Sequence, residues 1–364
     1  MARRAGAVAV VAAAVAAASM SAAAVRSPAR NAFVLRRLVA DPGSAAVTHD
    51  ADLVNAWGLA ASATGPWWTA NEARSTSTLY AGDGRKQALT VSVPGGPTGV
   101  AFNGGPGFAV RGGGRTGPAR FLYACEDGMI RGWSPTVPGG WSKEAEIAFD
   151  GSGTGAIFRG IALATLPGGG RRLYVTDFHN GRVLAFDRRW RPVDRPGWFR
   201  DPSIPGWYTP FDVVVSGARV FVSYASPAPV DGNDAPHGGY VDEFDLDGRL
   251  VSRIGRGSPL DEPWGLAVAP KGFGSLGGAL LVGNFGSGRI DAFRRARDGW
   301  AFAGQLRRPD GRPLSVPGLW GIAFATGGMS GPRTSLFVAA GPHRWHGASE
   351  VDIHGLLGAI APAA

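Results

Sequence analysis

Short apolar runs separated by Gly- and Pro-rich turns follow one another along the chain. Glycine (57) and proline (27) make up 84 of the 364 residues, so few segments reach the ~12 residues that a stable helix usually needs. The runs are rich in β-branched and aromatic residues, which is typical of strands. The pattern predicts an all-β protein and excludes a helical bundle.

One phrase recurs six times: a turn, a Gly or Asp pivot, and a short apolar run, as in Pro-Trp-Gly-Leu-Ala-Val at 263–268. Successive pivots are 41, 61, 52, 53 and 56 residues apart. A period of this length indicates a repeated structural unit. The phrase therefore predicts six units, with pivots at Gly58, Gly99, Gly160, Asp212, Gly265 and Gly321.

Each phrase is followed by a second strand and, in most copies, by a third. The third unit shows this best, with strands at 172–177 and 182–187 around an Asn-Gly turn. Small antiparallel sheets of about four strands, apolar on both faces, must cover one another, and a closed ring does this. We expect a six-bladed β-propeller, in which residues 349–353 form the third strand of the last blade and residues 33–39 complete that blade and close the ring.

The N-terminus reads Met-Ala-Arg-Arg, then an Ala-rich apolar stretch to about residue 18, then small residues, as in a cleaved secretory signal. The stretch is short for a membrane span, so an uncleaved anchor is the weaker alternative. We predict a signal and leader at 1–30, a single propeller at 31–355 and a C-terminal tail at 356–364. The mature protein is expected to be secreted or extracytoplasmic and to lack a transmembrane span.

The net charge is +9, but its arginines are scattered and form no dense basic block. Nucleic-acid binding is therefore not predicted. Cys125 is the sole cysteine, which excludes an internal disulfide. It lies in an apolar strand pattern and is expected to be a buried core residue.

The patterns Pro-x-Gly-(Ile/Val/Leu)-Ala, Leu-Tyr-Val-Thr-Asp and Asn-Gly-Arg-Val-x-x-Phe-Asp are similar to the NHL-type repeat of NHL- and TolB-like six-bladed propellers. The segments at 54–60, 263–267, 280–290 and 318–323 resemble, more closely, an uncharacterised exported bacterial family, some of whose members carry a PEP-CTERM sorting tail. The resemblance covers about residues 31–355 and implies the propeller fold, but no known activity. The C-terminal residues lack the sorting motif, so release or loose surface association is expected.

In a propeller the residue before each pivot lies near one mouth of the central channel. The residues at these positions suggest two alternatives: aromatic packing between blades, or a shallow apolar mouth that binds a ligand. In the second alternative Arg159 pairs with a carboxylate or phosphate of a sugar or aromatic ligand that stacks on the rings. The ring consists of Trp57, Thr98, Arg159, Phe211, Trp264 and Trp320.

Polar residues at the strand ends could form a second ring. They either tie their own turns to the backbone or converge on the axis, where they could hold a cation such as calcium. The first ring offers almost no oxygen ligands, which argues against a metal-dependent lactonase. The second set consists of Asn71, Glu126, Asp177 and Asn284, with His179 close by.

Two further clusters are weaker metal candidates. Residues 231–237 alternate oxygen-bearing side chains but lack the distal Glu of a calcium loop, so a solvated loop is expected. His343 and His346, near His354, would bind zinc only if a loop brought them together. No Gly-x-Ser-x-Gly or Gly-Lys-Ser/Thr motif is present, so neither a serine nucleophile nor a phosphate-binding loop is predicted.

The sequence leaves two main functions open. The first is a monomeric binding or scaffolding propeller that takes a small-molecule, carbohydrate or surface-protein ligand at the channel mouth. The alternative is a lactonase- or lyase-like enzyme with an axial site, with or without a metal. A third, weaker hypothesis is assembly with other exported proteins through blade edges. No catalytic residue is assigned and no cofactor is expected, although axial calcium stays open.

Overall fold

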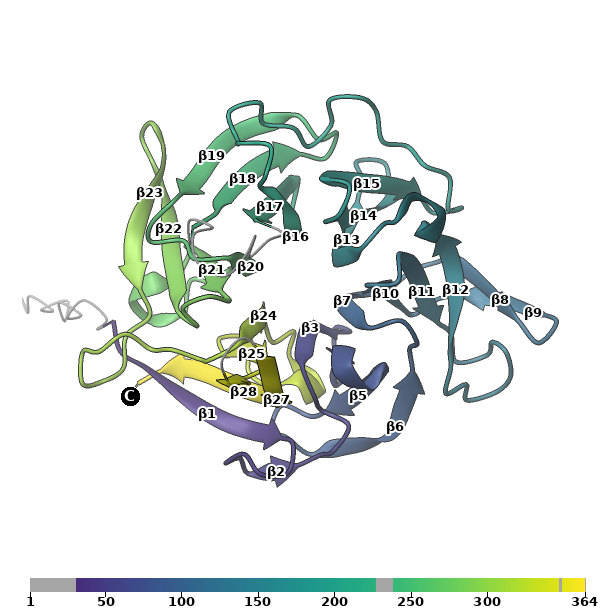
Figure 1. Ribbon diagram of the computed structural model, residues 1–364, viewed down its shortest axis with the longest axis horizontal. Helices are drawn as coiled ribbons and strands as arrows, with labels where there is room; N and C mark the ends of the chain where they lie inside the picture. Colours follow the sequence, from purple (N-terminus) through teal and green to yellow (C-terminus); the bar gives the residue numbers. More distant parts are fainter. Residues whose placement is uncertain (1–30, 227–237, 347–348, 364) are drawn as a thin grey trace, which may run out of the picture.

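The computed structural model describes residues 31–226, 238–346 and 349–363. Its strands form six mainly antiparallel sheets around a central axis (Figure 1). The chain is an all-β six-bladed propeller, as the repeated phrase predicts. The predicted leader at 1–30 and the insertion at 231–237 lie outside the described residues.

Each blade begins with the repeated phrase as its innermost strand. Blade 1 is β3 (Ala56–Ala61), β4 (Trp67–Asn71), β5 (Thr76–Tyr80) and β6 (Lys86–Ser92); blade 2 is β7 (Pro97–Phe102), β10 (Phe121–Cys125), β11 (Met129–Trp133) and β12 (Ala145–Asp150); blade 3 is β13 (Phe158–Thr165), β14 (Arg171–Asp177) and β15 (Arg182–Asp187). Blade 4 is β16 (Thr209–Ser216), β17 (Arg219–Ala225), β18 (Tyr240–Asp245) and β19 (Leu250–Arg256); blade 5 is β20 (Pro263–Val268), β21 (Leu280–Asn284), β22 (Ile290–Ala296) and β23 (Gly299–Gln305). Blade 6 is β24 (Leu319–Phe324), β25 (Leu336–Ala340), β28 (Leu356–Pro362), β1 (Phe33–Ala40) and β2 (Thr48–His49).

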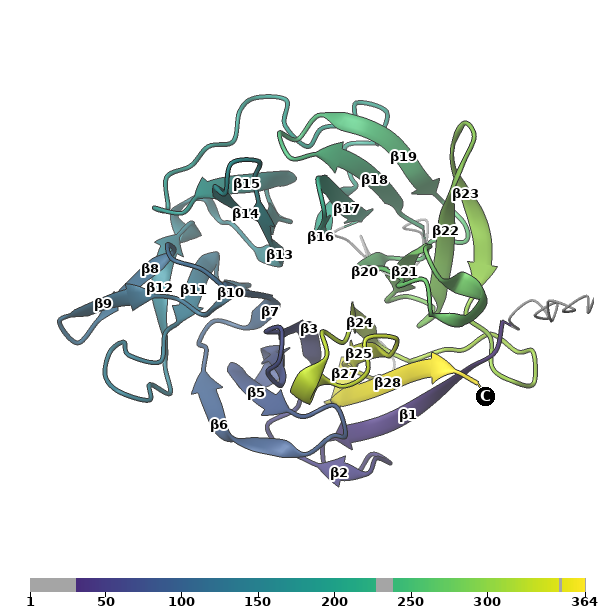
Figure 2. The same cartoon turned by 180° about the vertical axis from the view of Figure 1, so that it is seen from behind.

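Smaller elements are inserted into this plan. The hairpin of β8 (Ala109–Gly112) and β9 (Arg115–Pro118) projects from the rim at blade 2 (Figures 1 and 2). The hairpin of β26 (His343–His346) and β27 (Ser349–Ile353) interrupts blade 6. Four short 3-10 helices complete the described part of the chain: η1 (Glu72–Arg74), η2 (Ser152–Thr154), η3 (Gly274–Leu276) and η4 (Gly328–Ser330).

The pivot glycines allow the inner strands to approach each other closely around the axis. A Cβ atom added to Gly58 would lie 2.7 Å from the carbonyl oxygen of Thr98, and one added to Gly99 would lie 2.6 Å from that of Arg159. A Cβ atom added to Gly321 would contact the carbonyl oxygen of Trp57, so the inner strand of blade 6 approaches that of blade 1 equally closely. Only glycine leaves room for this backbone contact.

The hydrophobic core is divided among the interfaces between blades. Six buried clusters each join two neighbouring blades, and a seventh lies on the axis. Between blades 1 and 2, for example, Trp68 stacks on Phe121 at 3.9 Å between ring centroids. The blades therefore cover one another's apolar faces, as expected of sheets that cannot bury both faces alone.

The N-terminal strand closes the ring as predicted. β1 pairs antiparallel with β28, with Phe33 opposite Pro362 and Ala40 opposite Leu356. Phe33, Leu38 and Val39 are almost completely buried. The first strand of the described chain thus lies beside the last one in blade 6.

The third strand of blade 6 differs from the expectation. Residues 349–353 pair with β26 in a separate hairpin, and the segment predicted to be a tail supplies β28 instead. A strand between β25 and β1 contacts a core on both faces: Leu356 and Ile360 belong to the cluster shared with blade 5, and Leu357 to that shared with blade 1. The Glu and Asp of residues 349–353 do not suit such a position, whereas the apolar residues 356–362 do. The propeller therefore extends beyond residue 355.

Candidate functional site at the first channel mouth

One end of the channel, which we call the first mouth, is bordered by the connections between the second and third strands of the blades. The start of each inner strand pairs with the end of the second strand, as Ala56 does with Asn71 and Pro263 with Asn284. The connections that follow therefore begin beside the residues that precede the pivots. The longest of them belong to blades 4 and 6.

The aromatic residues before the pivots meet on the axis and fill it. Trp57 stacks on Trp320 at 3.4 Å, and Phe285 stacks on the other face of Trp320 at 3.8 Å. Trp264 and Phe211 meet these rings edge to face. The exposed fractions of Trp57, Trp264, Trp320 and Phe211 are 4, 3, 5 and 7%. These rings form an aromatic plug in which they contact each other on the axis, rather than packing between adjacent blades.

Thr98, the one small polar residue of the predicted ring, links blade 2 to blade 3. Its buried hydroxyl donates to the carbonyl oxygens of Phe158 and Arg159, at 3.0 and 2.9 Å. Thr176 and Ser223 similarly donate to carbonyls of the following blade, those of Phe211 and Trp264. These hydroxyls satisfy backbone acceptors at the tightest part of the ring.

Arg159 lies against the plug and is paired. Its guanidinium carbon lies 5.0 Å from the centroid of Trp57 and 5.8 Å from that of Phe178, and its Nη1 forms an ion pair with Glu126. Nε has no hydrogen-bond partner in the described part of the chain, and Nη1 has the ion pair with Glu126 but no hydrogen bond there. Burial lowers the pKa of Arg159 to about 10, although the negative charge of Glu72 opposes this.

Glu72 and Asn55 complete a polar cluster with Arg159 and Glu126. Asn55 donates from Nδ2 to Glu72 at 2.6 Å, and its Oδ1 accepts from Trp320 Nε1 at 3.0 Å. A Cβ atom on Gly96 would lie 3.4 Å from an oxygen of Glu72 and from one of Glu126, so the two carboxylates flank the same point. We call Asn55, Glu72, Glu126 and Arg159 the mouth cluster.

Sequence reasoning missed Asn55 and Glu72. Glu72 and Glu126 both come directly after the second strand of their blades, so the position that identified Glu126 could also have identified Glu72. Nothing in the spacing signals Asn55, whose left-handed backbone (φ 47°) depends on the tertiary structure.

The other strand-end residues do not join Glu126 at the axis. Asn71 bonds to Thr69, Thr76 and Thr78 in its own blade. Asp177 accepts from Asn180 and Arg182, and Asn284 bonds to Asp291 and to the backbone of Asp261 and Arg289. All three are buried. Asp177 and Asn284 bond to the backbone of the connections in their own blades, whereas Asn71 bonds to threonine hydroxyls of its own blade. His179 is exposed on its turn.

Two of the metal candidates lie largely outside the part of the chain whose side chains the structure describes. No group of three or more His, Cys, Asp and Glu side chains that could hold an ion occurs among the described residues. The side chains of His343 and His346 and the whole of 231–237 fall outside that description. Cys125 is buried in the core as expected, and burial raises the pKa of its thiol to about 12.

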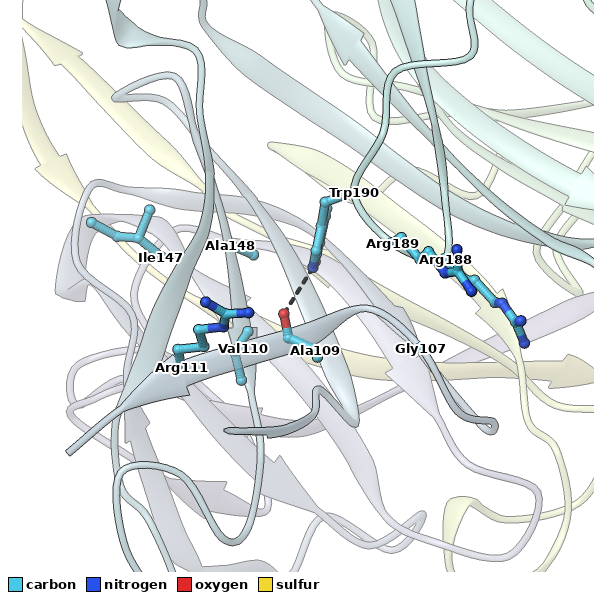
Figure 3. A pocket seen from close by; sticks show the side chains of 9 residues that line it. All are labelled: Gly107, Ala109, Val110, Arg111, Ile147, Ala148, Arg188, Arg189 and Trp190. Carbon is cyan, nitrogen blue, oxygen red and sulfur yellow. Dashed lines mark hydrogen bonds between the residues drawn. The ribbon is translucent and has the colours of Figure 1, made fainter. Parts of the chain in front are cut away.

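A separate groove of about 520 Å³ lies at the rim between blades 2 and 3 (Figure 3). Arg111, Arg188 and Arg189 line it, and Trp190 crosses it to donate from Nε1 to the carbonyl oxygen of Ala109 at 2.9 Å. The groove is lined by the inserted strand β8, by β12 and by the residues after β15, and it contains none of the predicted site residues.

In the part of the chain described, no helix has the length and apolar character needed to cross a membrane.

Comparisons with solved structures agree with the fold. The PQQ-bound aldose sugar dehydrogenase of Streptomyces coelicolor gives a TM-score of 0.52 at 15% identity, covering 91% of this chain and 99% of that one. A catalytically inactive virginiamycin B lyase of Staphylococcus aureus with quinupristin gives 0.50 at 11% identity, covering 90 and 99%. At these identities the likeness shows the fold alone.

Sequence comparison identifies relatives of this chain. No family model matches it. It is 33% identical over 301 residues to uncharacterized protein R648 of Acanthamoeba polyphaga mimivirus, and 30% identical over 303 residues to uncharacterized protein L690 of the same virus. The alignments cover 79% of this chain in both cases, and 72 and 77% of the relatives. This six-bladed β-propeller therefore belongs to the same family as these two viral proteins.

Proposed function

We propose that the protein is an exported, monomeric binding propeller that takes a small ligand rich in hydrogen-bond donors, such as a carbohydrate, at the first mouth. The single observation that carries the proposal is the convergence of Glu72 and Glu126 beside Gly96. A paired set of carboxylates on a channel mouth, supported from below by rigid aromatic packing, is a typical way to orient a polar ligand.

The charge balance of the mouth cluster determines the ligand class. Two carboxylates face one guanidinium, and Arg159 is already paired with Glu126. The side chain of Glu126 is 33% exposed and Glu72 is half-buried, so their oxygens can accept from a ligand. The cluster favours hydroxyl or ammonium donors over the carboxylate or phosphate that Arg159 alone would attract.

The test compares three sugars by calorimetry: glucosamine, glucose and gluconate. We expect glucosamine to bind best and gluconate worst, because only the last adds a negative charge. Glu72→Gln should weaken glucosamine binding by about tenfold, as expected for loss of one charged hydrogen bond. Glu146→Gln on the outer strand β12 is the matched control and should change nothing. Stronger binding of gluconate, or equal binding by Glu72→Gln, would contradict the proposal.

A lyase- or hydrolase-like enzyme is the second candidate. It is favoured by the same pair of carboxylates. Glu72, which is half-buried near the guanidinium of Arg159, can act as a general base. Turnover of an esterified or lactone-bearing sugar that Glu72→Gln abolishes while binding persists would favour catalysis. Binding without turnover favours the first candidate.

A further inference from the structure

The pivot of blade 4 departs from the repeat. Five pivots are glycine because the neighbouring inner strand leaves no room for a side chain, but blade 4 carries Asp212. Its Oδ1 occupies the space that a Cβ on Gly160 would need. Asp212 thus carries a carboxyl group at a position where the other five blades have no side chain, and such departures from a local rule are expected at functional sites.

Asp212 lines a small axial cavity. The cavity measures about 70 Å³ and is walled by Trp264 and by the pivots Gly58, Gly99 and Gly321. Asp212 is 6% exposed, and its carboxyl accepts from the backbone N–H of Val213 but forms no ion pair within the described chain. Burial raises its pKa well above the ordinary value, and no cation among the described residues opposes this shift.

The axial cavity continues into the opposite mouth of the channel, which is an apolar funnel. Leu59, Ile161, Val213, Leu266 and Ile322 line both spaces. The funnel measures about 380 Å³, and among the described residues no charged side chain lines it. Among the residues that line the two spaces in the described chain, Asp212 is thus the acidic group at the base of a hydrocarbon-lined opening, on the far side of the aromatic plug from the mouth cluster.

We propose that this funnel binds a small primary alkylammonium ion, with the ammonium group paired to Asp212 in the axial cavity and the alkyl chain along the funnel wall. The ammonium group would neutralise the buried carboxylate in the axial cavity, and the alkyl chain would contact the apolar inner strands of the funnel. A hard metal ion fits less well, because it needs several oxygen ligands and the cavity wall supplies one carboxylate. The site does not depend on the function proposed for the first mouth.

The test measures binding of hexylamine, hexanol and hexanoate by calorimetry near pH 8. Hexylamine should bind more tightly than hexanol by at least about tenfold, and hexanoate should not bind. Hexyltrimethylammonium should bind poorly, because its bulky head does not enter a cavity of about 70 Å³.

Two variants separate the carboxylate from the fold. Asp212→Asn keeps the shape, and Asp212→Gly restores the residue that the other blades use, so it should fold at least as well as the parent. Both should lose the advantage of hexylamine over hexanol, whereas Glu72→Gln at the other mouth should keep it. Equal binding of hexylamine and hexanol by the parent, retained preference in both variants, or saturation by sodium or potassium ions alone would overturn the proposal.

Discussion

Individual residues of the inner strands decide how closely the blades can approach one another. The glycine pivots permit backbone contact between neighbours, and buried hydroxyls such as that of Thr98 satisfy the carbonyls there. The glycines were visible in the sequence as a repeated position. Their partners were not, because each lies in the following blade, more than forty residues away in most cases.

Gly99→Ala tests this packing. The added methyl would lie 2.6 Å from the carbonyl oxygen of Arg159 and 2.9 Å from Ile161, and both belong to the tightly held inner strand of blade 3. We expect the free energy of unfolding to fall by about 2–4 kcal/mol, measured by urea denaturation. Gly140→Ala, where a Cβ meets nothing within 4 Å, is the control and should stay within about 0.5 kcal/mol. Equal stability of the two variants would show that the ring is not tight at the pivot.

Asp291 gives a prediction for pH. It is buried, and burial raises its pKa to about 6 despite hydrogen bonds from Gln305 and Asn284; Arg289 and Asp261 are its charged neighbours. The folded state therefore binds more protons than the unfolded state between about pH 4 and 6. The part of the unfolding free energy that depends on protonated Asp291 is therefore fully present below about pH 4 and is lost as the pH rises through 6.

Asp291→Asn should remove this loss of unfolding free energy at high pH, because an amide does not ionise. Compared with the parent, the variant should gain on the order of 2 kcal/mol of unfolding free energy at about pH 7.5 and change little at about pH 4. Urea denaturation at both pH values measures this. Asp83→Asn, in an exposed turn, is the control. A difference between Asp291→Asn and the parent that is independent of pH would refute the assignment.

At the scale of elements, local pattern predicted strands well and their partners less well. The strands of blade 3 follow directly from the sequence because a short turn joins β14 to β15. In blade 6, residues 349–353 have a good strand pattern but form an accessory hairpin, while the chain end supplies the central strand. Strand propensity is local, whereas the choice of β28 depends on which segment can bury both of its faces between two blades.

At the scale of the whole molecule, closure makes the first strand of the ring essential. β1 buries Phe33, Leu38, Val39 and Ala40, and Phe33 packs on Phe273 of blade 5 at 4.7 Å between centroids. Phe33 and Leu38 each contribute roughly 2–5 kcal/mol and Val39 adds somewhat less, so their sum is on the order of the stability of a whole domain, about 5–15 kcal/mol. The ring should therefore unfold as a unit once β1 is lost.

A chain that starts at Asp41 should have no cooperative thermal transition by calorimetry, whereas one that starts at Asn31 should melt like the full chain. Phe33→Ala is the milder variant and should cost about 3–5 kcal/mol of unfolding free energy. An unchanged transition in the chain that starts at Asp41 would mean that the other blades hold the ring closed without β1.

The sequence by itself determined the number of blades, the strands that begin them and the N-terminal closure. These follow from a repeated apolar phrase and from a strand left over before it, both of which are local patterns. Only the tertiary structure decided which polar residues share a site. Glu72 joined Glu126 and Arg159, while Asn71, Asp177 and Asn284 stayed within their own blades. Likewise, the sequence marked Asp212 as an exception, but only the folded ring placed its carboxyl in the axial cavity. The physical reason is that a site on the axis is assembled from different blades, whose relative positions depend on packing around the whole ring.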